Sequence, residues 1–196
     1  MALEYIDRSS PADYTLDVGS VQSAAQVRAN TPDSITMAIT DDNVQLIALG
    51  GTNPPVDGPA GDTLRSLGGG DLLFTDGATQ MTFIDDGTQT EDGILIDSAT
   101  QQNFQDVIQN FKAGDSLLVY GFKAGPPSVI PGGLPTGVTV TDTAQGAQLN
   151  LDFTGGGALP TASVLFAGLS ALQLGETHQF LTGTDPTTMT PYLFIV

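Results

Sequence analysis

The chain has no cysteine, no tryptophan and a single histidine, and it has only 5 lysines and arginines against 22 aspartates and glutamates. Without cysteine it forms no disulfide, no thiolate metal site and no cysteine nucleophile. The net charge of −17 argues against nucleic acid and anionic membranes as partners, because both attract clustered basic residues. Such a charge fits either a cation-binding surface or one that is merely kept soluble, and both readings stay open.

Signatures of the common enzyme classes are also missing. No G-x-S-x-G occurs for a serine hydrolase, and His178 alone cannot complete an H-E-x-x-H zinc site. The glycine run at residues 68–71 lacks the lysine of a phosphate-binding loop. Paired carboxylates are too common among 22 acids to indicate a glycosidase. We therefore predict that the chain is not an enzyme.

Turn-forming residues are abundant. The chain has 24 glycines and 12 prolines, and Glu4, Glu91 and Glu176 are its only glutamates. Aspartate and glycine favour turns, so this composition predicts a β-rich fold. Hydrophobic residues make up 40% of the 196 residues, enough for one domain with a core.

Targeting segments are not evident. The N-terminal residues carry acids where a cleavable signal needs a basic start and an apolar run, so we expect export to use another signal. The longest apolar stretch, residues 164–174, is too short to span a bilayer.

Alternating or short apolar segments between Gly/Asp turns predict strands. Their centres recur roughly every 9–12 residues, a spacing that suits a β-solenoid or a β-sandwich. The predicted strands cover residues 34–40, 44–49, 63–67, 72–74, 80–84, 93–96, 115–122, 138–141, 147–153, 163–166 and 192–196.

Two segments carry helical signals. Phe104, Val107, Ile108 and Phe111 are spaced as one face of a helix, which predicts a helix over residues 100–113 that ends at Gly114. Residues 20–30 predict one or two helical turns, and residues 164–174 a strand that runs into a short apolar helix. The domain plan is an N-terminal extension or arm over 1–32 and a β-rich domain over 33–196, with a helix–strand cap at 100–122.

Residues 106–122 read D-V-I-x-x-F-x-x-G-D-x-L-x-V-x-G-F. Three further patterns follow in the sequence: G-V-T-V-T-D from residue 137, which suggests a hairpin, V-x-x-x-G-L at 164–169, and an apolar segment at 192–196. This set resembles the C-terminal regions of RTX-type (haemolysin-type calcium-binding) proteins exported by type I secretion. The resemblance covers about residues 60–196, and it implies a parallel β-solenoid or β-roll with a short capping helix, all-β in class. The alternative fold is a β-sandwich.

Calcium is the cofactor that this resemblance implies. RTX repeats read G-G-x-G-x-D-x-L-x, with turn carboxylates and carbonyls around Ca²⁺. Residues 68–74 resemble one such repeat without its spacers, and no tandem copies follow. The candidate ligands are Asp71, Asp76, Asp85, Asp86, Asp92 and Asp97; the alternative is that these aspartates form turns and bind no metal.

The resulting hypothesis is a secreted bacterial structural or adhesive surface protein, extracellular or on the cell surface. We expect it to self-associate with the help of divalent cations, to meet a type I exporter during secretion, and to enter neither nucleic-acid complexes nor membranes. Two alternatives stay open: an extracellular enzyme or its accessory module, for which residues 1–59 leave little room, and a virion or appendage subunit with a sandwich fold.

Overall fold

The protein is mostly β-strand, with two mixed sheets and one helix in the part of the chain that the structure describes. The computed structural model describes residues 62–66, 72–75, 81–85, 92–98, 103–123, 133–154 and 161–196, and the backbone of five earlier strands. The early strands are β1 (Leu3–Asp7), β2 (Tyr14–Val18), β3 (Gln26–Asn30), β4 (Ile35–Ile39) and β5 (Gln45–Leu49).

Eleven strands and one helix follow β5 in the part of the chain that the structure describes. They are β6 (Asp62–Ser66), β7 (Leu72–Thr75), β8 (Met81–Asp85), β9 (Gly93–Asp97), β10 (Gln105–Gln109), β11 (Ser116–Tyr120), β12 (Val138–Asp142), β13 (Gly146–Leu151), β14 (Ala162–Ala167), α1 (Ala171–Thr177), β15 (Phe180–Thr184) and β16 (Pro191–Ile195).

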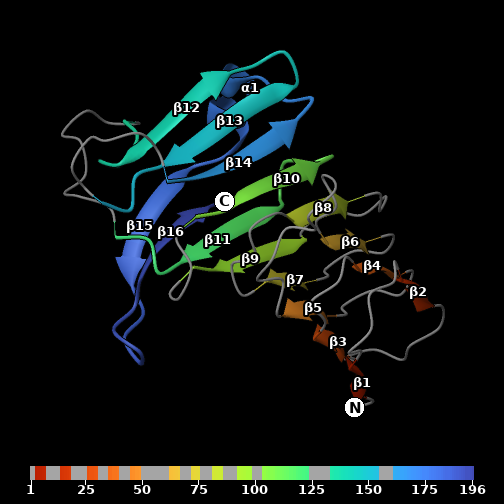
Figure 1. Cartoon of the computed structure of the whole chain (residues 1–196). Coiled ribbons are helices and arrows are strands. Elements are labelled where there is room, and N and C mark those ends of the chain that lie inside the picture. The colour runs from red at the N-terminus through yellow and green to blue at the C-terminus, as the bar shows by residue number, and fades with distance from the viewer. Residues whose placement is uncertain are drawn as a thin grey trace.

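Consecutive strands belong to different sheets as far as β11. One eight-stranded sheet has the order β1-β3-β5-β7-β9-β11-β16-β15, and the other has the order β12-β13-β14-β10-β8-β6-β4-β2. The odd-numbered strands to β11 and the even-numbered strands to β10 pair in parallel. Figure 1 shows the result as two rows of strands that both begin near the N-terminus.

The described core lies between the two sheets, because buried residues alternate along β7 to β11, β13, β14 and β16. Strand register stacks these residues into continuous rows. One row contains Leu64, Phe83, Ile108 and Phe166, and another contains Leu73, Ile94 and Leu117. All of them are at most 4% exposed, so the rows belong to one continuous core.

Antiparallel strands end both sheets near the C-terminus. Strand β14 pairs in parallel with β10, and β13 and β12 then continue that sheet as an antiparallel meander. The hairpin β15–β16 does the same for the other sheet, because β16 pairs antiparallel with β11. Helix α1 lies near β12 and β13 with Leu174 buried, and the Ser170–Gln173 capping box starts it.

The predicted helix over residues 100–113 is wrong. Residues 105–109 form β10, which buries Asp106 and Ile108 and leaves Val107 half-exposed; the buried Phe104 directly before the strand continues this alternation. The four apolar residues fit a helical period, but neighbouring strands on both sides offer parallel pairing that an isolated sequence pattern cannot reveal. The cap at 100–122 is therefore strand, turn and strand rather than helix and strand.

The predicted helical turns at residues 20–30 are also wrong in part, since β3 occupies Gln26–Asn30. Strands β1 and β3 continue one sheet, and β2 the other, across the predicted boundary at residue 33. The remaining predicted strands are confirmed within one or two residues, and so is a short helix after β14. Strands β1, β2 and β15 were not predicted.

No helix among the described residues combines the length and the apolar character that crossing a membrane requires.

A pair of alanine substitutions tests the strand assignment of β10. Ile108 is fully buried and Val107 is half-exposed, although a helix would bury both. We expect Ile108→Ala to lower the free energy of unfolding by about 2–5 kcal/mol and Val107→Ala by about 1 kcal/mol or less. Urea unfolding of both variants measures this, and equal losses would contradict the strand.

Candidate functional site

Three buried carboxylates gather with one lysine where β8 ends and where β9 and β11 begin. Asp85 closes β8, Asp92 precedes β9, and Asp115 precedes β11, while Lys112 lies in the turn before Asp115. Each of the three aspartates is at most 4% exposed. We call this group of four residues the acidic edge. Buried carboxylates are rare without partners, so their contacts decide what the edge does.

Asp115 binds the neighbouring turn through backbone groups. Its Oδ1 accepts a hydrogen bond from the Asp92 N–H at 3.2 Å, and its Oδ2 accepts one from the Lys112 N–H at 2.6 Å. Gly114 precedes it with a φ of 103°, a conformation that glycine adopts without strain. This explains the F-x-x-G-D part of the motif: Phe111 packs inward against Phe166, and the Gly-Asp pair closes the turn.

The acidic edge contains one ion pair and one carboxyl group with a raised pKa. The Lys112 ammonium lies 2.7 Å from the Asp85 carboxylate. Burial, with the nearby charges of Asp85 and Asp92 adding to it, raises the pKa of Asp115 to about 6, although two backbone N–H donors oppose the shift. Lys112 thus supplies positive charge to a group of carboxylates that repel one another.

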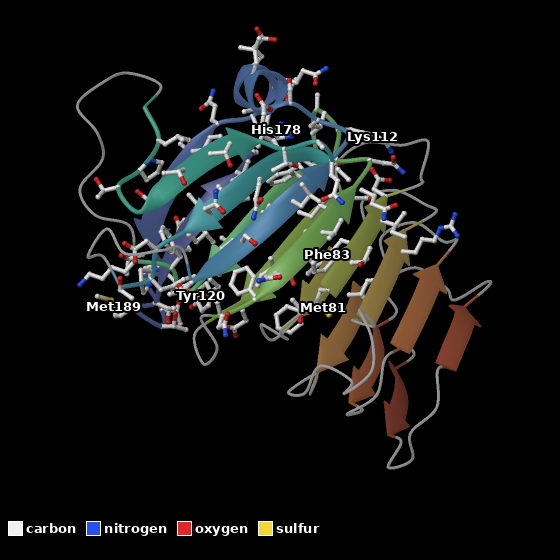
Figure 2. All side chains as sticks on the ribbon, turned by 45° about the horizontal axis from the view of Figure 1, so that its top comes forward. Met81, Phe83, Lys112, Tyr120, His178 and Met189 are labelled. Carbon is white, nitrogen blue, oxygen red and sulfur yellow. The ribbon has the colours of Figure 1, made fainter. Side chains whose placement is uncertain are left out.

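His178 completes the packing at this end, beneath α1 (Figure 2). Its ring stacks on Phe111 with centroids 4.5 Å apart, and its Nε2 lies 3.0 Å from the Lys112 carbonyl oxygen. Since a carbonyl only accepts, Nε2 donates this bond. Burial lowers the pKa of His178, so the neutral ring is favoured. These contacts give the histidine a positioning role over the turn that carries Lys112.

A fourth buried carboxylate lies at the opposite end of the strands. Asp106, the second residue of β10, accepts a hydrogen bond from the Met81 N–H at 2.9 Å. It is 2% exposed, and no described residue makes a hydrogen bond to its buried Oδ2. Burial raises the pKa of Asp106 well above its ordinary value. The motif aspartate at the start of D-V-I therefore lies in the core and binds the next strand of its sheet.

The six predicted calcium ligands are divided by the structure. Asp85 and Asp92 both belong to the acidic edge, whereas Asp97 ends β9 at the other end of the strands. Asp71, Asp76 and Asp86 lie outside the described residues. Among the residues described, no three His, Asp or Glu side chains form a group that could hold a metal ion. Calcium binding stays a prediction.

The turn between β15 and β16 is built around Asp185. Its Oδ1 accepts the Thr187 N–H at 2.7 Å, and its Oδ2 accepts the Tyr120 hydroxyl at 3.0 Å. These bonds lower the pKa of Asp185. The turn holds Met189 at a φ of 60° with its side chain 72% exposed.

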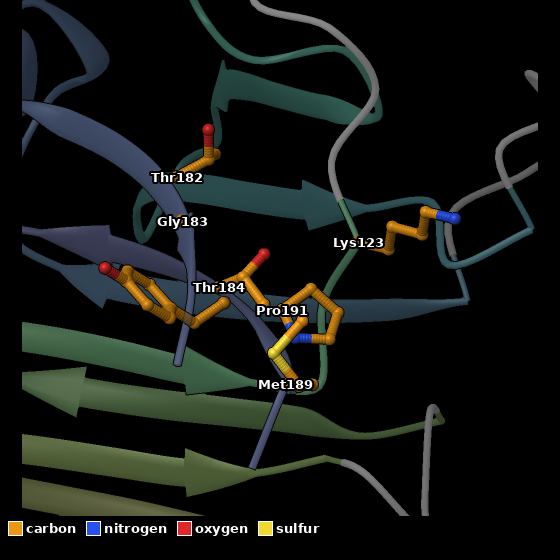
Figure 3. A pocket seen from close by; sticks show the side chains of 7 residues that line it. Lys123, Thr182, Gly183, Thr184, Met189 and Pro191 are labelled. Atoms are coloured by element: carbon orange, nitrogen blue, oxygen red, sulfur yellow. The ribbon is translucent and has the colours of Figure 1, made fainter. Parts of the chain in front are cut away.

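A cavity of about 400 Å³ lies beside this turn, lined by Lys123, Thr182, Gly183, Thr184, Met189, Pro191 and Tyr192 (Figure 3). Lys123 contributes its only charge, so the cavity differs from the acidic remainder of the chain.

Sequence reasoning missed Lys112, Asp106 and Asp115 as a structural set. Asp106 and Asp115 stood in the quoted motif, but their spacing along the chain does not show that one binds β8 and the other the turn before β9. Lys112 gave a usable signal, since it is one of only 5 basic residues.

No protein-family model matches this chain, and no curated protein and no solved structure matches it either.

The ion pair at the acidic edge predicts a specific coupling. Lys112→Met removes the ammonium that lies 2.7 Å from the buried Asp85 carboxylate, and we expect a loss of about 2 kcal/mol in the free energy of unfolding, between the values for exposed and buried pairs. Asp85→Asn in the same chain should recover most of this loss. Lys123→Met, which removes an exposed lysine, is the matched control. A loss that Asp85→Asn leaves unchanged would contradict the coupling.

The raised pKa of Asp106 predicts a pH dependence. A carboxyl whose pKa is higher in the folded chain binds more protons there, so stability falls as pH rises above about 3.9, the unfolded value. Asp106→Asn keeps an oxygen for the Met81 N–H and cannot ionise. We expect the variant to match the wild type at pH 4 and to exceed it at neutral pH in thermal unfolding. Glu176→Gln controls for the lost charge, and parallel pH profiles would contradict the prediction.

Proposed function

We propose that this chain is a parallel β-solenoid of the RTX-like kind, exported by a type I system, that serves outside the bacterial cell as a structural or adhesive surface component. Copies of it self-associate, and divalent cations promote the association. The proposal has no catalytic step.

The observation that carries the proposal is the strand order. Strands alternate between two parallel sheets from β1 to β11, and the inward residues of successive strands stack into rows. In a sandwich with an antiparallel plan, neighbouring strands in the chain would usually pair with each other, as β12, β13 and β14 do here. If the chain coils and each turn of the coil adds one strand to each sheet, the observed strand order follows.

The roles of the motif residues support the RTX-like part. Asp106 and Asp115 each bind a backbone N–H of an adjacent turn, and Phe111 fills the core beside them. These positions in D-V-I-x-x-F-x-x-G-D are therefore structural, as expected of a motif that marks the end of a coil. The antiparallel strands β12–β14 and β15–β16 cover the last turns, which a repetitive fold needs at its end.

Charge supports the dependence on cations. Two copies with a net charge of −17 each repel one another at low ionic strength. Lys112 neutralises part of the acidic edge from within, so external cations would act chiefly on the surface carboxylates. Calcium, which binds carboxylates with flexible geometry, is the divalent cation of choice for that role.

Sedimentation velocity and negative-stain microscopy test the proposal on the purified full chain. We expect self-association that increases with protein concentration, that is stronger with added Ca²⁺, and that a chelator partly reverses. Mg²⁺ and NaCl at matched ionic strength separate specific Ca²⁺ binding from screening. A monomer under all of these conditions would contradict the proposed self-association.

A further inference from the structure

The geometry points to strand β15 as the surface through which two copies of this chain join, by antiparallel pairing of β15 with its own copy across a twofold axis. This inference rests on the proposed self-association and assigns it to one strand.

Strand β15 is the last strand of its sheet, so one of its edges has no strand partner among the described residues. Gln179 and Val196 exchange both of their backbone hydrogen bonds, and Asp185 donates to Thr190 further along the hairpin. Antiparallel pairs alternate, so residues 181 and 183 bond to β16 as well. The N–H and C=O groups of Phe180, Thr182 and Thr184 therefore point to the open edge.

This edge lacks the devices that usually prevent pairing. Natural edge strands carry charges, prolines or bulges that repel a further strand. Residues 180–184 contain none of these, although the chain has 22 acidic residues. The other C-terminal edge strand, β12, ends in Asp142, whose Oδ1 accepts the Ala171 N–H at 2.7 Å at the start of α1.

An apolar stripe leads to the same edge. On the outer face of the sheet, strand register aligns residues of β7, β9, β11, β16 and β15 in one row, which consists of Phe74, Leu95, Leu118, Phe194 and Leu181. The first four are half-buried and Leu181, on the edge strand, is 44% exposed. At about 4.8 Å between strands, the stripe is roughly 20 Å long. Pairing through β15 would join two stripes end to end.

The conformation of the β15–β16 hairpin is fixed by its own contacts. The Tyr192 ring lies against Gly183, where a side chain would collide with it, so the register of β15 on β16 is fixed. Thr182 and Thr184, whose backbone groups point to the open edge, are both exposed. Figure 2 places Met189, exposed at the adjoining turn, on the same side as Tyr120 and far from His178.

The charge of the chain favours a second copy of it as the partner that pairs with the open edge of β15. Copies with −17 each repel least where their facing strands carry no charge, and β15 is such a strand. A twofold axis brings the same strand from both copies together, and a strand pairs antiparallel with itself. Asp185 and Glu176 flank the strand, so cations should strengthen the contact by screening them.

Substitutions at Thr182 test the inference in sedimentation equilibrium over a concentration series with Ca²⁺. Thr182→Pro removes an edge N–H without touching the bonds to β16, and Thr182→Lys places charge on the edge. We expect each to raise the dimer dissociation constant by about tenfold or more, while Thr182→Ala, which keeps the backbone donor, behaves as the wild type. Thermal unfolding checks that each variant is folded.

Each outcome has one meaning. If the wild type associates and the lysine variant associates equally well, β15 is not the interface, but the proposed self-association stands. If the wild type is monomeric throughout, both proposals fail.

Discussion

Buried carboxylates that accept backbone N–H groups from an adjacent turn are the interaction on which this fold depends. Asp115 binds the N–H groups of Asp92 and Lys112, and Asp106 binds that of Met81. A turn at the end of a strand leaves N–H groups that no strand partner satisfies, and an unsatisfied buried donor costs about 1–3 kcal/mol. The carboxylates satisfy these donors and tie segments that are distant in the chain to one another.

Burying a carboxylate is unfavourable when it is charged, and the two ends of the strands reduce this cost in different ways. At the acidic edge, Lys112 pairs with Asp85 while Asp115 keeps a pKa of about 6 beside it. At the opposite end no cation among the described residues pairs with Asp106, and its raised pKa favours the neutral acid. The acidic edge therefore combines carboxylates with an ion pair, whereas Asp106 is held by a hydrogen bond to a backbone N–H.

The inner and outer faces of the sheets carry different sets of apolar residues. Inward rows supply the core, and the outer face of one sheet carries the apolar stripe that ends at β15. The net charge of −17 makes the approach of two copies unfavourable wherever their charged side chains face one another.

The sequence by itself determined the β-rich class, most of the strands and the absence of thiol chemistry, because turn residues, alternation and composition are local properties. It also marked Asp106, Phe111, Gly114 and Asp115 as a set. Only the tertiary structure decided that residues 105–109 form a strand, since a helical spacing of apolar residues is overruled when β8 and β14 pair on both sides. The acidic edge and the open edge of β15 were likewise decided by pairing between segments far apart in the chain. Such pairing is set by the packing of whole rows, which no short stretch of sequence contains.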